Sequence, residues 1–166
     1  MFRFRPFDIP AFAAALGSGL VAGIFFAFSS FVMPALGQVA ANRGIDVMNA
    51  LNRTVYTPSF MVAFWGTTVM CLASVVVALT RRQGPIGMAQ FCAGGVFLIG
   101  CVGITAAFNV PMNEALAGAA PGTQHELQIW TQVLEDWTFW NHVRTGAALL
   151  SACLFTLVLV CARSGR

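Results

Sequence analysis

Long apolar stretches dominate the chain. Four windows contain no Asp, Glu, Lys or Arg, namely residues 9–42, 54–80, 83–113 and 145–162. A helix needs about 20 apolar residues to cross the hydrocarbon core of a membrane. The first three windows exceed that length, whereas the fourth reaches it only if its helix begins near Asp136 and carries Asn141, His142 and Arg144 in its first two turns. The pattern predicts an all-α fold, a four-transmembrane-helix bundle with spans of about 9–36, 56–80, 85–112 and 136–162.

The connections between the spans carry helical patterns of their own. Met48, Leu51 and Val55 recur at helical spacing in the first connection, and Leu127 and Trp130 do so in the third. These patterns predict short surface helices in the first and third connections. We expect residues 1–166 to form a single integral membrane domain, because the length leaves no room for a second one.

Composition agrees with a membrane location. Hydrophobic residues make up 58% of the chain and charged residues only 9%, whereas soluble domains have about 25% charged residues. The net charge of +3 is too small and too scattered for nucleic-acid binding, so the expected partner is the lipid bilayer. Arginines flank both termini and the second connection, and the acidic segment 114–136 has none. This distribution predicts both termini in the cytoplasm, in the inner or plasma membrane of a bacterium.

Small residues recur every four positions on the first predicted helix, at Ala15, Gly19 and Gly23. Such a stripe lets two helix backbones approach closely. It indicates either a helix contact within the bundle or the face of a homo-oligomer. The five cysteines lie in apolar runs with no metal-binding spacing, and we interpret them as small hydrophobic residues.

The most informative polar residues lie where the third predicted span ends and the fourth begins. Asn109 and Asn113 share one helix face, as do Trp137, Asn141 and Arg144. Polar groups are costly in hydrocarbon, so a cluster of them at facing helix ends is a candidate functional site. The structural alternative is a set of hydrogen bonds between helices, with Arg144 reaching water or pairing with a nearby carboxylate.

The functional interpretation assigns catalysis to His142 and Arg144. Arg144 would stabilise a developing oxyanion, and His142, turned about 100° from Asn141 on the helix, would accept a proton. The predicted substrate-binding residues are Asn109, Asn113, Asn141, Trp137, Trp140 and Phe28. No metal site is expected, because the chain has only His125 and His142 and no metal-binding motif. A haem held by His142 is a minor alternative.

Several motifs resemble one known family. They are Gly23-x-Phe-Phe-x-Phe-Ser-x-Phe-Val-Met-Pro34-Ala-Leu36, Asn49/Asn52 followed by Pro58-x-Phe60, Asn109-x-Pro-x-Asn113, and Trp137-x-x-Trp140-Asn141-His142-x-Arg144-Thr145. In this order they are similar to the DUF1772 family of small four-helix membrane proteins, which includes the anthrone oxygenases. The resemblance implies O2-dependent oxidation of a phenolic anthrone with O2 as co-substrate and no other cofactor. It also implies roles for Asn109, Asn113, Asn141 and Arg144, while His142 is not expected in every member.

A flat apolar substrate would then enter from the lipid between helices lined by Phe25, Phe26, Phe28, Phe31 and Phe108. Two alternatives to an oxygenase remain open at this point. One is a non-catalytic protein that binds a small molecule or serves a structural role. The other is a redox membrane protein that binds haem or a metal.

Overall fold

The computed structural model describes residues 8–81 and 84–164, and within these ranges the chain forms helices and no strand. The first long helix consists of α1 (Asp8–Ala27), a π-helical turn (Phe28–Val32) and α2 (Met33–Gly37). It is followed by α3 (Ala41–Thr54) and α4 (Pro58–Arg81). The third long helix consists of α5 (Gly84–Phe97), two π-helical segments (Leu98–Gly103 and Thr105–Asn109) and α6 (Val110–Gly118). The fourth comprises α7 (Gln124–Gln132), a π-helical turn (Val133–Trp137) and α8 (Thr138–Ser164).

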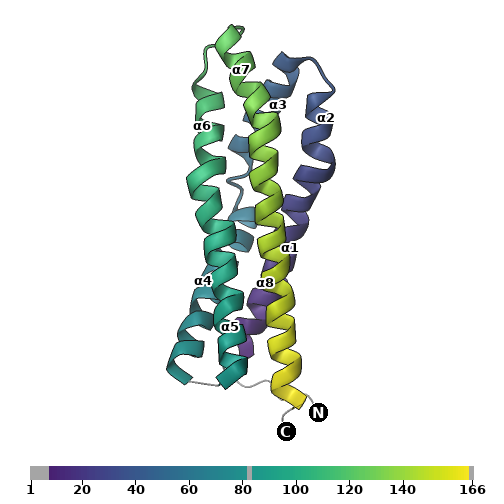
Figure 1. Cartoon of the computed structure of the whole chain (residues 1–166). Helices are drawn as coiled ribbons and strands as arrows, with labels where there is room; N and C mark the ends of the chain where they lie inside the picture. The colour runs from purple at the N-terminus through teal and green to yellow at the C-terminus, as the bar shows by residue number, and fades with distance from the viewer. Residues whose placement is uncertain (1–7, 82–83, 165–166) are drawn as a thin grey trace.

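These elements form a four-cornered bundle, as Figure 1 shows. Helix α1 packs on α4 and α8, and α5 packs on the same two helices, so consecutive long helices are neighbours and run antiparallel. The start of α1 and the end of α8 lie at one end of the bundle. Each long helix contains a segment that is long and apolar enough to cross a membrane: Asp8–Gly37, Pro58–Thr80, Gly84–Gly118 and Gln124–Ala162. The predicted all-α bundle of four apolar spans is therefore confirmed.

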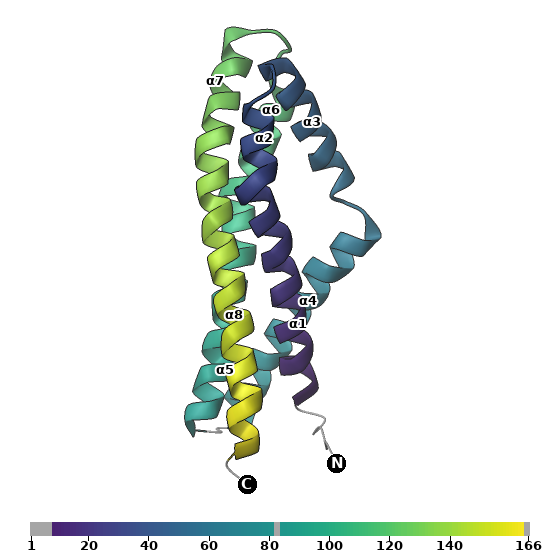
Figure 2. The same cartoon turned by 90° about the vertical axis from the view of Figure 1, so that its right-hand side faces the viewer.

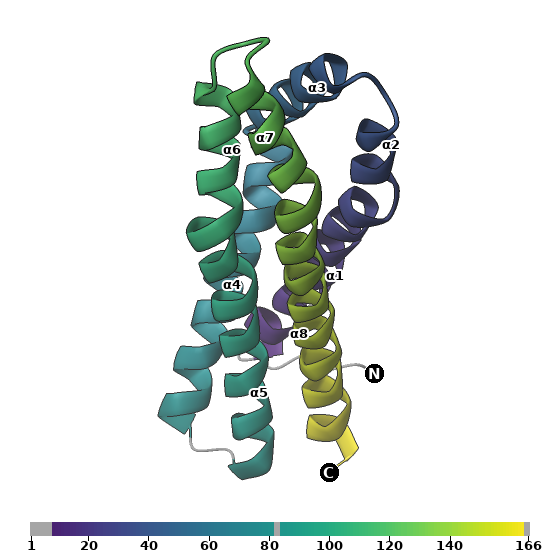
Figure 3. The ribbon, with the colours of Figure 1, turned by 45° about the horizontal axis from the view of Figure 1, so that its top comes forward.

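The spans differ in length, and this difference determines how the helices are arranged at the end of the bundle opposite the start of α1. The fourth span has 39 residues and is about 58 Å long, whereas a hydrocarbon core is about 30 Å thick. Helix α4 has 24 residues, which gives about 36 Å, and it begins only part-way up the bundle. Helix α3 fills the remaining height, descending at a slant from α2 to meet α4 (Figure 2). Seen with its top tilted forward, the bundle shows α3 passing behind α7 (Figure 3).

The two predicted surface helices have different outcomes. Helix α3 is amphipathic, as expected, and buries Ile45 and Met48 against α2, α6 and α7. The helical segment of the third connection, α7, does not stand apart, because it continues into α8 through the π-helical turn. The fourth span therefore begins earlier than the predicted residue 136. Trp130 and Trp137 of this helix belong to a second hydrophobic core cluster of the bundle.

Two prolines mark places where the helical hydrogen-bond pattern changes. Pro34 and Pro111 each lie within the first two residues of the helix that follows a π-helical segment. Proline has no N–H group and its ring clashes with the preceding turn, so the regular ladder cannot pass through it unchanged. A π-helical turn absorbs this mismatch by adding a residue to the turn, and such turns are frequent at functional sites. Here they hold Ser29, Thr105 and Asn109, which face the bundle interior.

Close helix contacts depend on glycines other than the predicted stripe. A Cβ added at Gly94 would lie 2.8 Å from the carbonyl oxygen of Cys71, and one at Gly100 would lie 2.6 Å from Ala147 Cβ. By contrast, Gly19 and Gly23 are exposed, and an added Cβ would meet no atom of the described residues within 4 Å. Gly19 and Gly23 therefore make no close contact within the bundle, whereas Ala15 packs against its core. The homo-oligomer interpretation of the stripe stays a prediction.

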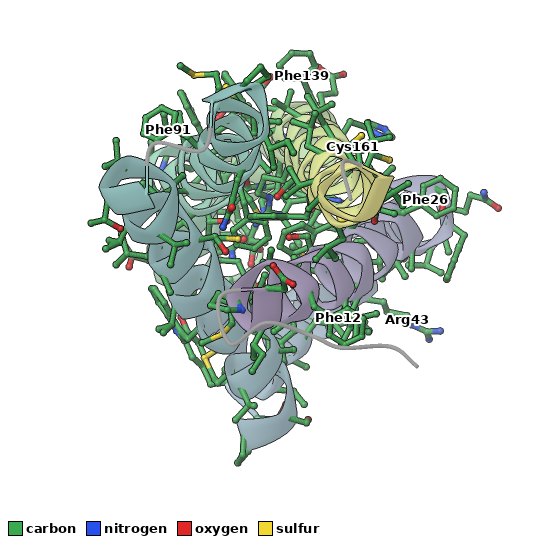
Figure 4. All side chains as sticks on the ribbon, turned by 90° about the horizontal axis from the view of Figure 1, so that it is seen from below. Phe12, Phe26, Arg43, Phe91, Phe139 and Cys161 are labelled. Carbon is green, nitrogen blue, oxygen red and sulfur yellow. The ribbon has the colours of Figure 1, made fainter. Side chains whose placement is uncertain are left out.

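The outer surface of the bundle is apolar and aromatic. Viewed along its axis, Phe12, Phe26, Phe91 and Phe139 point away from the centre, as does Cys161 (Figure 4). Each of these side chains is exposed in the isolated chain. A soluble protein rarely shows so much contiguous apolar surface, whereas in a bilayer this surface faces lipid.

Candidate functional site

A cavity of about 590 Å³ lies in the half of the bundle away from the start of α1, where α3 leads into the beginning of α4. Its walls come from α1, α3, α4, the third long helix and the part of the fourth around the start of α8, and most of the lining is aromatic or aliphatic. The aromatic wall includes Phe25, Phe28, Phe60, Phe64 and Trp137. The volume falls within the range of pockets that hold drug-sized ligands, roughly 300–1,000 Å³.

Arg144 supplies the buried positive charge of this cavity. Its side chain is only 5% exposed. Nη1 donates to Thr105 Oγ1 at 3.1 Å and Nη2 donates to Asn141 Oδ1, so both ends of the guanidinium are held. The guanidinium carbon lies 4.2 Å from the ring centre of Phe25 and 5.2 Å from that of Trp137. Contacts of this kind between a cation and aromatic rings are stabilising, particularly away from water.

Asn141 fixes the position of Arg144 relative to the first helix. It is fully buried, and its Nδ2 donates to the carbonyl oxygen of Phe25 at 2.7 Å and to Ser29 Oγ. The Phe25 carbonyl lies just before the π-helical turn, and its oxygen can accept this bond because a carbonyl oxygen has two lone pairs. Asn141 thus connects α1 to α8 while its oxygen accepts the hydrogen bond from Arg144. The bridge between helices agrees with the structural alternative, but Arg144 does not, because it is buried and bonds to Asn141 and Thr105 rather than to water or a carboxylate.

The third long helix presents a polar face to the cavity. Thr105, Asn109 and Asn113 recur every four residues, and all three line the cavity. Asn109 is 1% exposed, and its Nδ2 donates to the carbonyl oxygen of Trp137 at 3.1 Å. That bond joins the third helix to the π-helical turn before α8. Eight residues of helix separate Thr105 from Asn113, which corresponds to about 12 Å.

Hydrogen bonds within the chain leave several polar atoms of cavity residues without a partner. Among the residues that the structure describes, six such buried atoms belong to the cavity lining: Asn49 Oδ1, Asn52 Nδ2, Asn109 Oδ1, Asn113 Oδ1, Trp137 Nε1 and Arg144 Nε. A buried polar atom that makes no hydrogen bond costs roughly 1–3 kcal/mol. Six such atoms around one cavity leave hydrogen-bonding capacity that a bound polar molecule or water would use.

The structure brings together most of the predicted site residues. Asn109, Asn113, Trp137, Arg144 and Phe28 line the cavity. Asn141 lies directly behind Arg144 and supports it.

Two predicted site residues lie elsewhere. Trp140 is stacked on Phe108, with ring centres 3.7 Å apart, and does not line the cavity. His142 is exposed on a different face of α8 from Asn141 and Arg144, and it too is absent from the cavity lining. The predicted catalytic role of His142 gains no support from this placement.

The expected phenylalanine passage is only partly found. Phe25 and Phe28 line the cavity, but Phe26, Phe31 and Phe108 are exposed on the outer surface. The cavity instead reaches the surface near the connection of α3 to α4, where Tyr56 is 69% exposed and Trp65 is 53% exposed.

Sequence reasoning missed several cavity residues. Asn49 and Asn52 were assigned to a surface helix, yet they line the cavity because α3 descends beside the bundle. Thr105 could have been found, since it extends the four-residue spacing of Asn109 and Asn113 by one turn. Glu114 also lines the cavity, and it is the only carboxylate among its described lining residues.

The donors and acceptors of the cavity suit an oxygen-bearing organic molecule. Amide groups, an indole N–H and a guanidinium hydrogen-bond to carbonyl, hydroxyl or oxyanion groups. Within residues 8–81 and 84–164, no three His, Cys, Asp or Glu side chains come together in a way that could hold a metal ion.

A family model described as anthrone oxygenase matches residues 60–154, which is more than half of the chain. The chain belongs to the anthrone oxygenase family. The match includes α4, the third long helix and Arg144, whereas α3 and the first helix lie outside it. No curated protein and no solved structure gave a significant match. Together with the four apolar spans, the match identifies a membrane protein of the anthrone oxygenase family.

Proposed function

We propose that this anthrone oxygenase family member oxidises a flat phenolic molecule with O2 in the cavity around Arg144, without a resident cofactor. The observation that carries the proposal is a buried guanidinium in an aromatic cavity, with Nε unpartnered among the described residues. The family match supports the reaction class.

The chemistry follows from the acidity of the substrate. The central CH2 of an anthrone loses a proton readily, because the resulting anion is a delocalised phenolate. Arg144 stabilises the oxygen on which the negative charge accumulates, and hydrogen-bond donors held in place before the reaction contribute most at this stage. Thr105 and Asn141 orient the guanidinium so that no reorganisation is needed when the charge develops.

Glu114 is the proposed proton acceptor. It is a carboxylate of the cavity lining, whereas His142 lies on another face. The substrate anion gives electrons to O2, a carbon–oxygen bond forms, and the resulting hydroperoxide takes up a proton. Loss of water from the hydroperoxide then leaves the ketone. Overall, one CH2 group and one O2 yield one C=O group and one water, so no further reductant is required.

The location of the cavity suits a substrate dissolved in the membrane. The cavity reaches the surface beside Tyr56 and Trp65, aromatic residues of the kind that lie at the boundary between lipid and water. The proposed topology places both termini in the cytoplasm of a bacterium and the cavity toward the outer face. The exposed Gly19 and Gly23 are the proposed contact of a homo-oligomer.

Oxygen uptake by the purified protein in lipid nanodiscs tests the proposal. With emodin anthrone we expect protein-dependent O2 consumption and formation of one anthraquinone for each O2 consumed. Empty nanodiscs correct for spontaneous oxidation. A protein that binds the anthrone tightly but leaves the rate at that of empty nanodiscs would support the non-catalytic binding alternative instead.

A further inference from the structure

The cavity has a second polar end, away from Arg144. Asn49 and Asn52 of α3 both line the cavity, and their separation of three residues places them on one helix face. One amide atom of each, Asn49 Oδ1 and Asn52 Nδ2, is buried with no partner in the described chain. Neither is used in the oxidation proposed above.

Asn113 faces the same end from the third long helix. Helix α3 packs against α6, and Asn113 lies in α6. Its Oδ1 is also buried without a partner in the described residues. Thr105, which holds Arg144, lies eight residues earlier, about 12 Å away along the helix. The amides of α3 and α6 therefore lie at a different height of the cavity from the Thr105–Arg144 pair.

The three amides define the kind of group that fits between them. Two unpartnered acceptors and one unpartnered donor match a hydroxyl group, which both donates and accepts hydrogen bonds. A carboxylate or phosphate only accepts, so it would leave the unpartnered amide oxygens of Asn49 and Asn113 without a donor. The neighbouring charged residues of the lining, Arg53 and Glu114, have opposite signs, so no net charge favours an anion.

We propose that Asn49, Asn52 and Asn113 bind a ring hydroxyl at the end of the substrate remote from Arg144, and so select hydroxylated aromatic substrates. This inference rests on the proposed function only for its kinetic readout. Asn49 and Asn52 belong to α3, which lies outside residues 60–154, the segment that matches the family model.

Substitution of Asn52 by Leu, which removes the amide and keeps the branched side-chain shape, gives the direct test. Two anthrones are compared, one with the remote ring hydroxyl and one without it. For Asn52→Leu we expect KM for the hydroxylated anthrone to rise about tenfold, the effect of one hydrogen bond, while kcat and the KM of the other anthrone stay within twofold. Asn42→Leu makes the same chemical change on α3 outside the cavity lining and should alter neither value.

An equal rise in KM for both anthrones, or no rise, would overturn the inference. If Asn52→Leu does not fold, Asn52→Ser shortens the side chain and is measured in the same way. Binding of the matching hydroxylated and unhydroxylated anthraquinones, followed by quenching of tryptophan fluorescence, separates this inference from catalysis. A tenfold loss of affinity confined to the hydroxylated anthraquinone supports it even if the wild-type protein oxidises nothing, and equal losses contradict it.

Discussion

Replacing Asn141 with Leu tests whether the buried polar cluster holds the bundle together. The substitution keeps the branched shape and the number of side-chain heavy atoms but removes three hydrogen bonds, to the Phe25 carbonyl, to Ser29 and from Arg144. Hydrogen bonds between membrane helices average about 0.6 kcal/mol, and one to a charged group is worth about 2 kcal/mol. We therefore expect Asn141→Leu to lower the free energy of unfolding by about 3 kcal/mol.

Reversible unfolding in bicelles or mixed detergent micelles measures this change. Thr156→Val on the same helix provides the control, because the Thr156 hydroxyl is exposed and bonds only within its own helix, to the Ala152 carbonyl at 2.8 Å. It should change stability by less than about 0.5 kcal/mol. A loss below about 1 kcal/mol for Asn141→Leu would refute the reasoning, because the three bonds could not then be formed as described.

Three further substitutions test packing and catalysis. Gly94→Ala should destabilise the bundle by about 1–3 kcal/mol, because its Cβ would meet the Cys71 carbonyl, whereas Gly95→Ala should be neutral or slightly stabilising in the same unfolding assay. Equal effects at the two positions would mean that α4 and α5 do not approach closely at Gly94. Glu114→Gln should reduce kcat for anthrone oxidation at least about 100-fold, while His142→Gln should leave it within twofold. If His142→Gln instead has the larger effect, His142 rather than Glu114 is the proton acceptor. Thr105→Val should lower kcat about tenfold with little change in KM, because it frees Arg144 Nη1, and a change in KM alone would assign Thr105 to substrate binding.

The long apolar windows were sufficient to predict the bundle, because four spans of that length have few other stable arrangements. Helical spacing alone also placed Asn141 and Arg144 on one face and His142 on another, as observed. The start of the fourth helix was harder, since helical spacing predicted the segment around Leu127 and Trp130 as a separate surface helix, whereas α7 continues into α8 through a π-helical turn.

Spacing along one helix could not show which segments meet across the bundle. The position of α3 depends on the short α4, which leaves a corner of the bundle for Asn49 and Asn52 to occupy. An amphipathic pattern is the same whether a helix lies on a membrane or against other helices. The outward stacking of Trp140 on Phe108 likewise depends on a contact between the third and fourth helices that spacing does not encode.

The most direct test of the central claim is the rate of O2 uptake with emodin anthrone by wild-type protein and by Arg144→Gln, both purified in the same nanodiscs. Glutamine retains a polar side chain but removes the positive charge. If the guanidinium stabilises the oxyanion, the rate above that of empty nanodiscs falls by about 100-fold or more, with folding and anthraquinone binding preserved. An Arg144→Gln protein that is folded and oxidises the anthrone at the wild-type rate would contradict the account.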